Sequence, residues 1–77
     1  MQTYQNYIEA NPNVMFGKPC VKGTRIPVDL ILEKLGNGET FDDLLDAYPR
    51  ITNQAILACL TFASLSIRNE EVIRFAA

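Results

Sequence analysis

The chain contains no histidine, and this absence limits the chemistry that it can perform. Histidine is the commonest general base in enzymes and the usual activator of serine and cysteine nucleophiles. The only cluster of carboxylates, Asp42, Asp43 and Asp46, falls on the polar side of a predicted helix, where solvated acids are expected. We therefore predict a protein that is not an enzyme and that uses no cofactor.

Cysteine is scarce as well, since Cys20 and Cys59 are far apart and form no C-x-x-C motif. Without histidine, a zinc site would need carboxylates in place of imidazoles, which is uncommon. Two reduced thiols that serve as small hydrophobic side chains are the favoured interpretation. A disulfide or a metal site is the alternative. We accordingly predict no metal site.

Long hydrophobic runs are also missing. No stretch of 18 apolar residues occurs, so we predict no membrane-spanning helix and no membrane partner. The first six residues have neither the basic nor the apolar region of a signal peptide, and we expect a cytoplasmic protein. The 77 residues, 48% of them hydrophobic, predict a single globular domain over 1–77. A core this small supplies only about 3–5 kcal/mol, so we expect a homodimer or another bound partner.

Two glycines, two prolines and three cations are concentrated in residues 17–28, which read GKPCVKGTRIPV. Glycine permits backbone angles that other residues resist, and proline restricts its own. Residues 20–26 are predicted to form a hairpin that turns at Lys22-Gly23, with the glycine at positive φ. Residues 3–10 are predicted to form a strand. The expected product is a short β ribbon with its turns.

Two helices are predicted to follow the ribbon. Apolar residues at helical spacing predict the first from Val28 to Leu35, with its end at Gly36-Asn37-Gly38. Residues 40–43 read TFDD, which has the form of a capping box, and they predict the start of a second helix. Pro49 ends that helix, because proline cannot continue it.

A third helix is predicted from about Asn53 to Leu65, because Thr52 is a good N-cap. The second and third helices then have helix-turn-helix proportions. The predicted fold is mainly α, with a homeodomain-like or winged-helix-like three-helix core over 28–66 and a β ribbon over 3–27. Residues 67–77 are expected to form a C-terminal helical tail, either as a continuation of the third helix or as a short fourth one.

These motifs resemble a family of small bacterial proteins known as domain of unknown function 433. Its pattern is G-K-P-x-x-K-G-T-R-I-P-V, a helix, a G-E-[ST] turn, a second helix, Y-P and a third helix. This chain matches it in order at 17–19, 22–28, 38–40, 48–49 and 56–60. Family members look like helix-turn-helix proteins, and many resemble VapB-type antitoxins paired with toxins of PIN-like nuclease fold. The resemblance implies an antitoxin-like protein that binds such a toxin and operator DNA.

The charged residues argue both for and against DNA binding. Lys18, Lys22 and Arg25 place three of the seven cations within eight residues, but a net charge of −2 and a pI near 4.9 are low for a DNA-binding domain. The third helix carries no charge over 53–65, which predicts weak phosphate attraction. Arg25 either pairs with a carboxylate of its own domain or contacts phosphate or a partner's acid. The candidate contacts to DNA or to a partner are Lys18, Lys22, Arg25, Arg50, Asn53 and Gln54.

A protein interface is the other hypothesis for the third helix. Its apolar residues spread around more than one stripe, as in a helix that is covered on several sides. Related sequences more often carry a charge where this chain has Leu57 and an acid where it has Ala55, which favours a buried contact. A helix that simply fills the core of a monomer is the alternative. The alternative function is a dimeric adaptor that binds no nucleic acid. The candidate self-association residues are Leu57, Leu60, Thr61 and Phe62.

Overall fold

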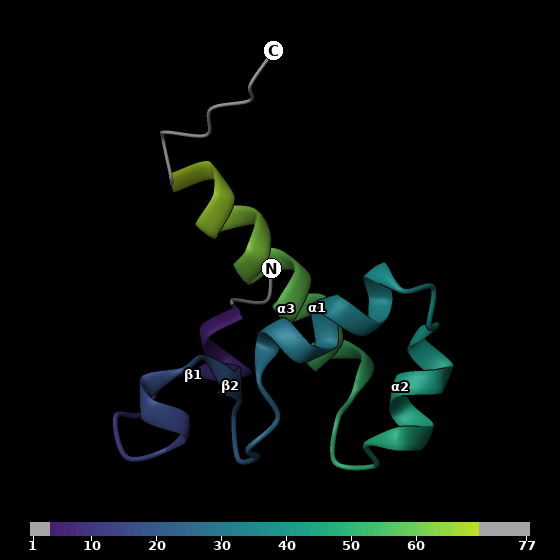
Figure 1. The fold of residues 1–77 in the computed structure, drawn as a ribbon, viewed down its shortest axis with the longest axis horizontal. Helices are drawn as coiled ribbons and strands as arrows, with labels where there is room; N and C mark the ends of the chain where they lie inside the picture. Colours follow the sequence, from purple (N-terminus) through teal and green to yellow (C-terminus); the bar gives the residue numbers. More distant parts are fainter. Residues whose placement is uncertain (1–3, 70–77) are drawn as a thin grey trace.

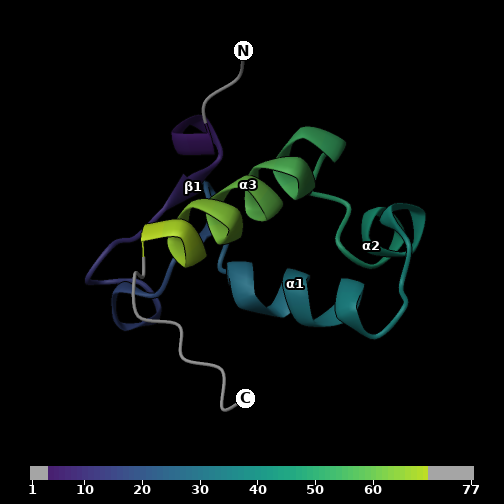
Figure 2. The same cartoon turned by 90° about the horizontal axis from the view of Figure 1, so that it is seen from above.

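Three helices make up half of the described chain. A computed structural model describes residues 4–69, and its helices are α1 (Val28–Gly36), α2 (Phe41–Ala47) and α3 (Asn53–Asn69). The last turns of α3 project beyond the other helices (Figure 1). From above, α1 runs along one side of α3, and α2 lies beside the end of α1 and the start of α3 (Figure 2). The mainly helical fold with a short β ribbon before the helices is confirmed.

The starts of α2 and α3 are set by the side chains that the sequence indicated. The backbone N–H of Asp43 donates to Thr40 Oγ1 at 3.1 Å, and the N–H of Thr40 donates to Asp43 Oδ2 at 2.8 Å. These two bonds complete the predicted capping box. At the start of α3, the N–H of Ala55 donates to Thr52 Oγ1 at 3.1 Å. The predicted helix starts are therefore confirmed.

A two-stranded antiparallel ribbon precedes the helices. Strand β1 (Ile8–Glu9) pairs with β2 (Cys20–Val21) so that Ile8 lies opposite Val21. The N–H of Val21 also donates to the carbonyl of Ile26 at 2.9 Å, which closes the predicted turn. Gly23 has a φ of +79°, the left-handed value expected of it. Residues 4–27, which include this ribbon, are called the N-terminal lobe below.

The prediction of a strand over residues 3–10 is wrong for most of that range. Tyr4–Asn6 forms a turn of 3-10 helix, η1, and only Ile8–Glu9 is extended. The turn brings the Tyr4 ring onto α3, where its centroid lies 5.6 Å from that of Phe62. Packing of the Tyr4 ring against α3 is thus favoured over a longer hydrogen-bonded pairing of β1 with β2.

The third helix is longer than predicted, because it continues past Leu65 to Asn69. Neither glycine nor proline interrupts the chain between these two residues, so no local signal ends the helix at Leu65. The predicted C-terminal tail over 67–77 thus begins inside α3. Its remaining part, residues 70–77, lies outside the described residues.

The core forms where the lobe and the three helices meet. Both cysteines lie in it as buried free thiols. Its most deeply buried aliphatic side chains are one from each helix, Ile31, Leu44 and Ile56. Among residues 4–69, no helix has the length and apolar character needed to cross a bilayer. The buried hydrophobic residues are Ile8, Cys20, Val21, Val28, Ile31, Leu44, Ile51, Ala55, Ile56, Ala58 and Cys59.

Candidate functional site

The outward face of α3 exposes large aliphatic side chains. Leu57, Leu60 and Ile67 are 53%, 39% and 59% exposed. Their separations of three and seven residues place them on one side of the helix, and Ser64 lies between Leu60 and Ile67 on that side. These four residues are called the α3 stripe below. The opposite side of the same helix buries Ala55, Ile56, Ala58 and Cys59 in the core.

The structure separates the four residues predicted for self-association. Leu57 and Leu60 belong to the α3 stripe, and Thr61 is exposed beside it. Phe62 is half-buried on the other side of the helix, where its ring packs at an angle of 59° against Tyr4. The outward face therefore contains three of the four residues.

The α3 stripe is electrically neutral. The first charged residue of α3 is Arg68, in its last turn. Exposed positions before it are asparagine, glutamine, leucine, threonine, serine and isoleucine. Several large aliphatic side chains exposed on one side of a helix are typical of a protein-binding site, whereas a DNA backbone attracts cations. As a recognition helix for DNA, α3 could contribute hydrogen bonds at its start and little electrostatic attraction.

Two of the basic residues predicted to contact DNA or a partner, Lys18 and Lys22, bind groups of their own chain. Lys18 Nζ forms an ion pair with Asp29 Oδ2 at 2.9 Å, and this hydrogen bond raises the pKa of Lys18. Lys22 Nζ donates to the backbone carbonyl of Gln5 at 3.2 Å. Because both groups remain exposed, these contacts leave them accessible to water and to a partner.

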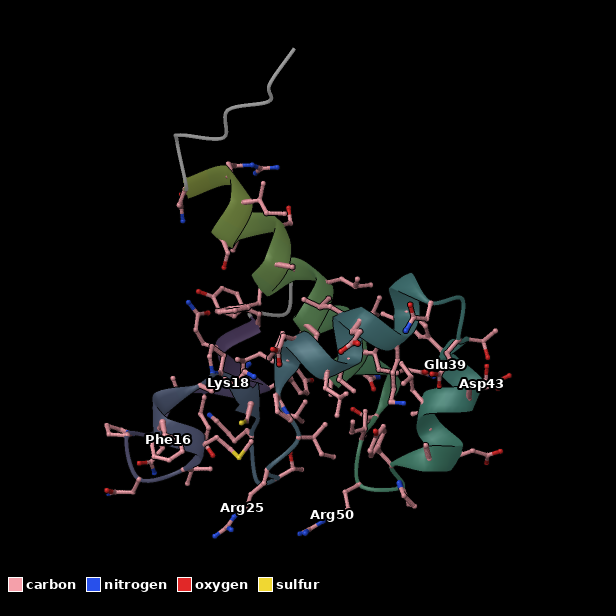
Figure 3. The ribbon with its side chains drawn as sticks, viewed as in Figure 1. Phe16, Lys18, Arg25, Glu39, Asp43 and Arg50 are labelled. Carbon is pink, nitrogen blue, oxygen red and sulfur yellow. The ribbon has the colours of Figure 1, made fainter. Side chains whose placement is uncertain are left out.

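The other two predicted cations point into solvent at one end of the molecule. Arg25 leaves the lobe and Arg50 leaves the turn between α2 and α3, and both guanidinium groups extend from the same end (Figure 3). Neither forms an ion pair with another described residue, so the pairing considered for Arg25 inside its own domain does not occur there. Asn53 and Gln54 follow Arg50 closely and are exposed at the start of α3.

The acids at the start of α2 and just before it have structural explanations. Asp43 completes the capping box of α2, and Glu39 just before the helix pairs with Lys34 at 3.5 Å. Asp42 lies in the first turn of α2, where acids stabilise the helix dipole. Within the stretch 4–69, no three cysteine, aspartate or glutamate side chains gather as a metal site would require.

Phe16 is a feature that the sequence did not single out. Its side chain is fully exposed at the tip of the lobe, in the short turn η2 (Met15–Gly17). Met15, Phe16 and Gly17 all have positive φ, at 51°, 58° and 81°. The sequence signal was an apolar pair, Met15-Phe16, inside a segment that is otherwise rich in turn residues.

An apolar groove lies between the lobe, the first turns of α1 and the second half of α3. Its volume is about 330 Å³. The ion pair between Lys18 and Asp29 lies at its border, because both residues line it. Its apolar lining comprises Pro19, Val28, Leu32, Phe62, Ala63 and Ile67. We call it the α1–α3 groove.

Comparison with known proteins finds one solved structure of similar fold and one matching family model. A protein described as a DUF433 member, from Anabaena variabilis, has a crystal structure that matches with a TM-score of 0.77 and 28% sequence identity. The match covers 84% of this chain, and this chain spans 64% of the length of that one. No curated protein matches. A family model described as "Protein of unknown function (DUF433)" matches residues 8–63, which is most of the chain. The chain therefore belongs to the DUF433 family.

Proposed function

We propose that this chain is a non-enzymatic, antitoxin-like domain that binds a protein partner through the α3 stripe. The observation that carries the proposal is the exposure of Leu57, Leu60 and Ile67 on a helix whose other side already fills the core. Full burial of one such side chain contributes about 1.5–3 kcal/mol. Three of them on one stripe form a contact surface, because each leaves between 39% and 59% of its surface exposed.

The class of partner comes from the resemblance to VapB-type antitoxins, which implies a toxin of PIN-like nuclease fold. An enzyme of that kind has an acidic, metal-binding active site. Arg25 supports the pairing, because its guanidinium is exposed and has no acidic partner among the described residues. Arginine forms two parallel hydrogen bonds with a carboxylate and suits contacts of this type. In this proposal, the α3 stripe supplies apolar burial and Arg25 supplies the charge.

The test is capture of the partner by tagged protein returned to its native cells, followed by titration of the purified pair. We expect a nuclease-like partner and a loss of affinity of at least about tenfold for Leu57→Lys, because an apolar contact becomes an unpaired charge. Asp46→Asn is the matched control, since it changes the net charge by the same amount from the exposed side of α2. Equal capture by a folded Leu57→Lys variant would contradict the role of the stripe. Absence of any nuclease-like protein would contradict the antitoxin role.

Operator DNA is a second candidate partner. Arg25 and Arg50 extend from one end of the molecule, and Asn53 and Gln54 begin α3 beside that turn. Arginine can hold a phosphate while asparagine or glutamine hydrogen-bonds to adenine. The helix-turn-helix arrangement of α2 and α3 supports DNA binding by the start of α3. The alternative function, a dimeric adaptor without nucleic acid, uses the α3 stripe alone.

A further inference from the structure

We infer that two copies of this chain associate by reciprocal insertion of Phe16 into the α1–α3 groove of the other copy. This contact shares only Ile67 with the α3 stripe and does not depend on the proposed function. It assigns a partner, a second copy of the chain, to two features that the fold leaves unexplained. These features are the exposed aromatic side chain and the apolar groove beside it.

The turn around Phe16 is built to present its side chain. The N–H of Val14 donates to the carbonyl of Asn11 at 2.8 Å, and the N–H of Gly17 donates to the carbonyl of Val14 at 3.1 Å. The N–H of Lys18 donates to the carbonyl of Met15 at 3.0 Å. The turn is therefore closed by its own backbone, with no contribution from the phenyl ring.

The backbone of this turn is strained for the residues that occupy it. Met15 and Phe16 both adopt left-handed φ values, which crowd the Cβ atom of any residue other than glycine. Within the monomer, Phe16 gains no burial in return, because its side chain is fully exposed. Strain held at an exposed apolar residue is characteristic of a functional contact.

The groove is suited to receive a phenyl ring. Its volume of about 330 Å³ is open and its lining is mostly apolar, with the Phe62 ring on one wall. Phe62 already packs in a tilted arrangement with Tyr4, the geometry that aromatic rings prefer, and a third ring can join it in the same way. Burial of an exposed phenyl ring here is favoured by the hydrophobic effect.

The position of the groove favours a second copy as the occupant. Lys18 and Pro19 line the groove only two and three residues after Phe16, so each copy presents the ring and the groove on neighbouring surface. Phe16 lies on the part of the lobe that is away from the helices (Figure 3), and its side chain is fully exposed, so it does not fill its own groove. If a two-fold axis relates the two copies and passes between these surfaces, the Phe16 ring of each copy lies opposite the groove of the other.

Charge supports the same occupant, and the buried area sets the strength of the contact. Lys18 and Asp29 form a pair of opposite charges at the groove, so a two-fold axis can place Lys18 of each copy near Asp29 of the other. One phenyl side chain buries about 150–250 Å². Two rings with an equal area of groove amount to roughly 600–1,000 Å², which is below the roughly 1,200 Å² of stable specific complexes and within the range of weak ones. The expected dimer is therefore weak and dependent on concentration.

Sedimentation of the full chain from about 1 µM to about 1 mM tests the inference. We expect a monomer–dimer equilibrium that Phe16→Ala weakens by at least about tenfold. Leu57→Ala is the matched control, because it removes an exposed apolar side chain from the α3 stripe and should leave the equilibrium unchanged. The thermal midpoint of Phe16→Ala should not fall below that of the wild type, since the ring makes no contacts in the monomer.

A mixing experiment distinguishes reciprocal insertion from other interfaces. Ser66→Phe, at an exposed position that lines the groove, should cover it and block insertion. Phe16→Ala keeps the groove and Ser66→Phe keeps the ring, so a mixture of the two should associate more strongly than either alone. A mixture that associates no better than its components would overturn the inference. A wild type that is monomeric at about 1 mM, or a dimer that Leu57→Ala dissociates, would do the same.

Discussion

At the scale of single residues, the two cysteines show how burial changes chemistry. Cys59 has no exposed surface, and burial raises the pKa of its thiol from 9.0 to about 11. Burial also raises the pKa of Cys20, against the opposing charge of Lys18. Both thiols therefore stay protonated and unreactive at neutral pH in the folded protein. They contribute packing to the core, as the sequence indicated.

This shift predicts a loss of stability in alkali. Below pH 9 the Cys59 thiol is protonated in both the folded and the unfolded chain, and its contribution is constant. As the pH rises from 9 toward 11, the thiolate forms only in the unfolded chain, so the free energy of unfolding falls. Urea unfolding at pH 8, 9 and 10 should show a steeper fall for the wild type than for Cys59→Ala, which has no thiol at this position. Identical slopes would show that the titration of Cys59 does not differ between the two states.

At the scale of elements, helix starts depend on single hydroxyl groups. Thr40 and Thr52 each accept a hydrogen bond from the first turn of their helix, at 3.1 Å in both cases. The α2 helix is only seven residues long, so it is marginal without its cap and its packing. The turn that leads into α3 begins where α2 ends. Loss of either cap therefore affects the orientation of the α3 stripe as well as stability.

We expect Thr40→Ala and Thr52→Ala each to lower the free energy of unfolding by about 0.5–2 kcal/mol. Thr61→Ala is the matched control, because Thr61 is exposed inside α3 and its hydroxyl caps nothing. Alanine is the better helix former there, so this change should be neutral or slightly stabilising. Urea denaturation monitored by circular dichroism gives all three values. Equal losses at Thr61 and Thr40 would mean that capping contributes nothing measurable.

At the scale of the whole molecule, apolar and cationic surfaces are segregated. The α3 stripe is neutral, whereas Arg25 and Arg50 extend from one end of a protein whose net charge is −2. The two surfaces favour different partners and respond differently to salt. Phosphate contacts release counterions and weaken steeply with salt, while apolar burial does not.

One variant should therefore distinguish binding of a protein partner from binding of DNA. Leu57→Lys adds a cation to α3, so it should weaken the protein complex and strengthen any DNA complex that uses α3. Fluorescence anisotropy with operator DNA at about 50 mM and about 200 mM salt should show a steep loss of DNA affinity and a further loss for Arg50→Ala. The protein complex should change little over the same range. A DNA affinity that is insensitive to salt and to Arg50 would argue against phosphate contacts at this end.

The sequence alone determined the local features of this protein. Thr40, Thr52 and Gly23 specify two helix starts and a turn, because capping bonds and φ preferences act within a few residues. The three helices, the helix-turn-helix and the burial of both cysteines followed from the same local patterns. Motif spacing was also sufficient to indicate the family.

Only the tertiary structure decided which surfaces are exposed. The apolar residues of α3 spread around the helix, so periodicity alone could not say that Leu57 faces solvent while Phe62 packs on Tyr4. The same holds for the 3-10 turn at residues 4–6, the exposed Phe16 and the α1–α3 groove. Each depends on contacts between segments far apart in the chain, and the sequence pattern of one segment does not contain the shape of the other.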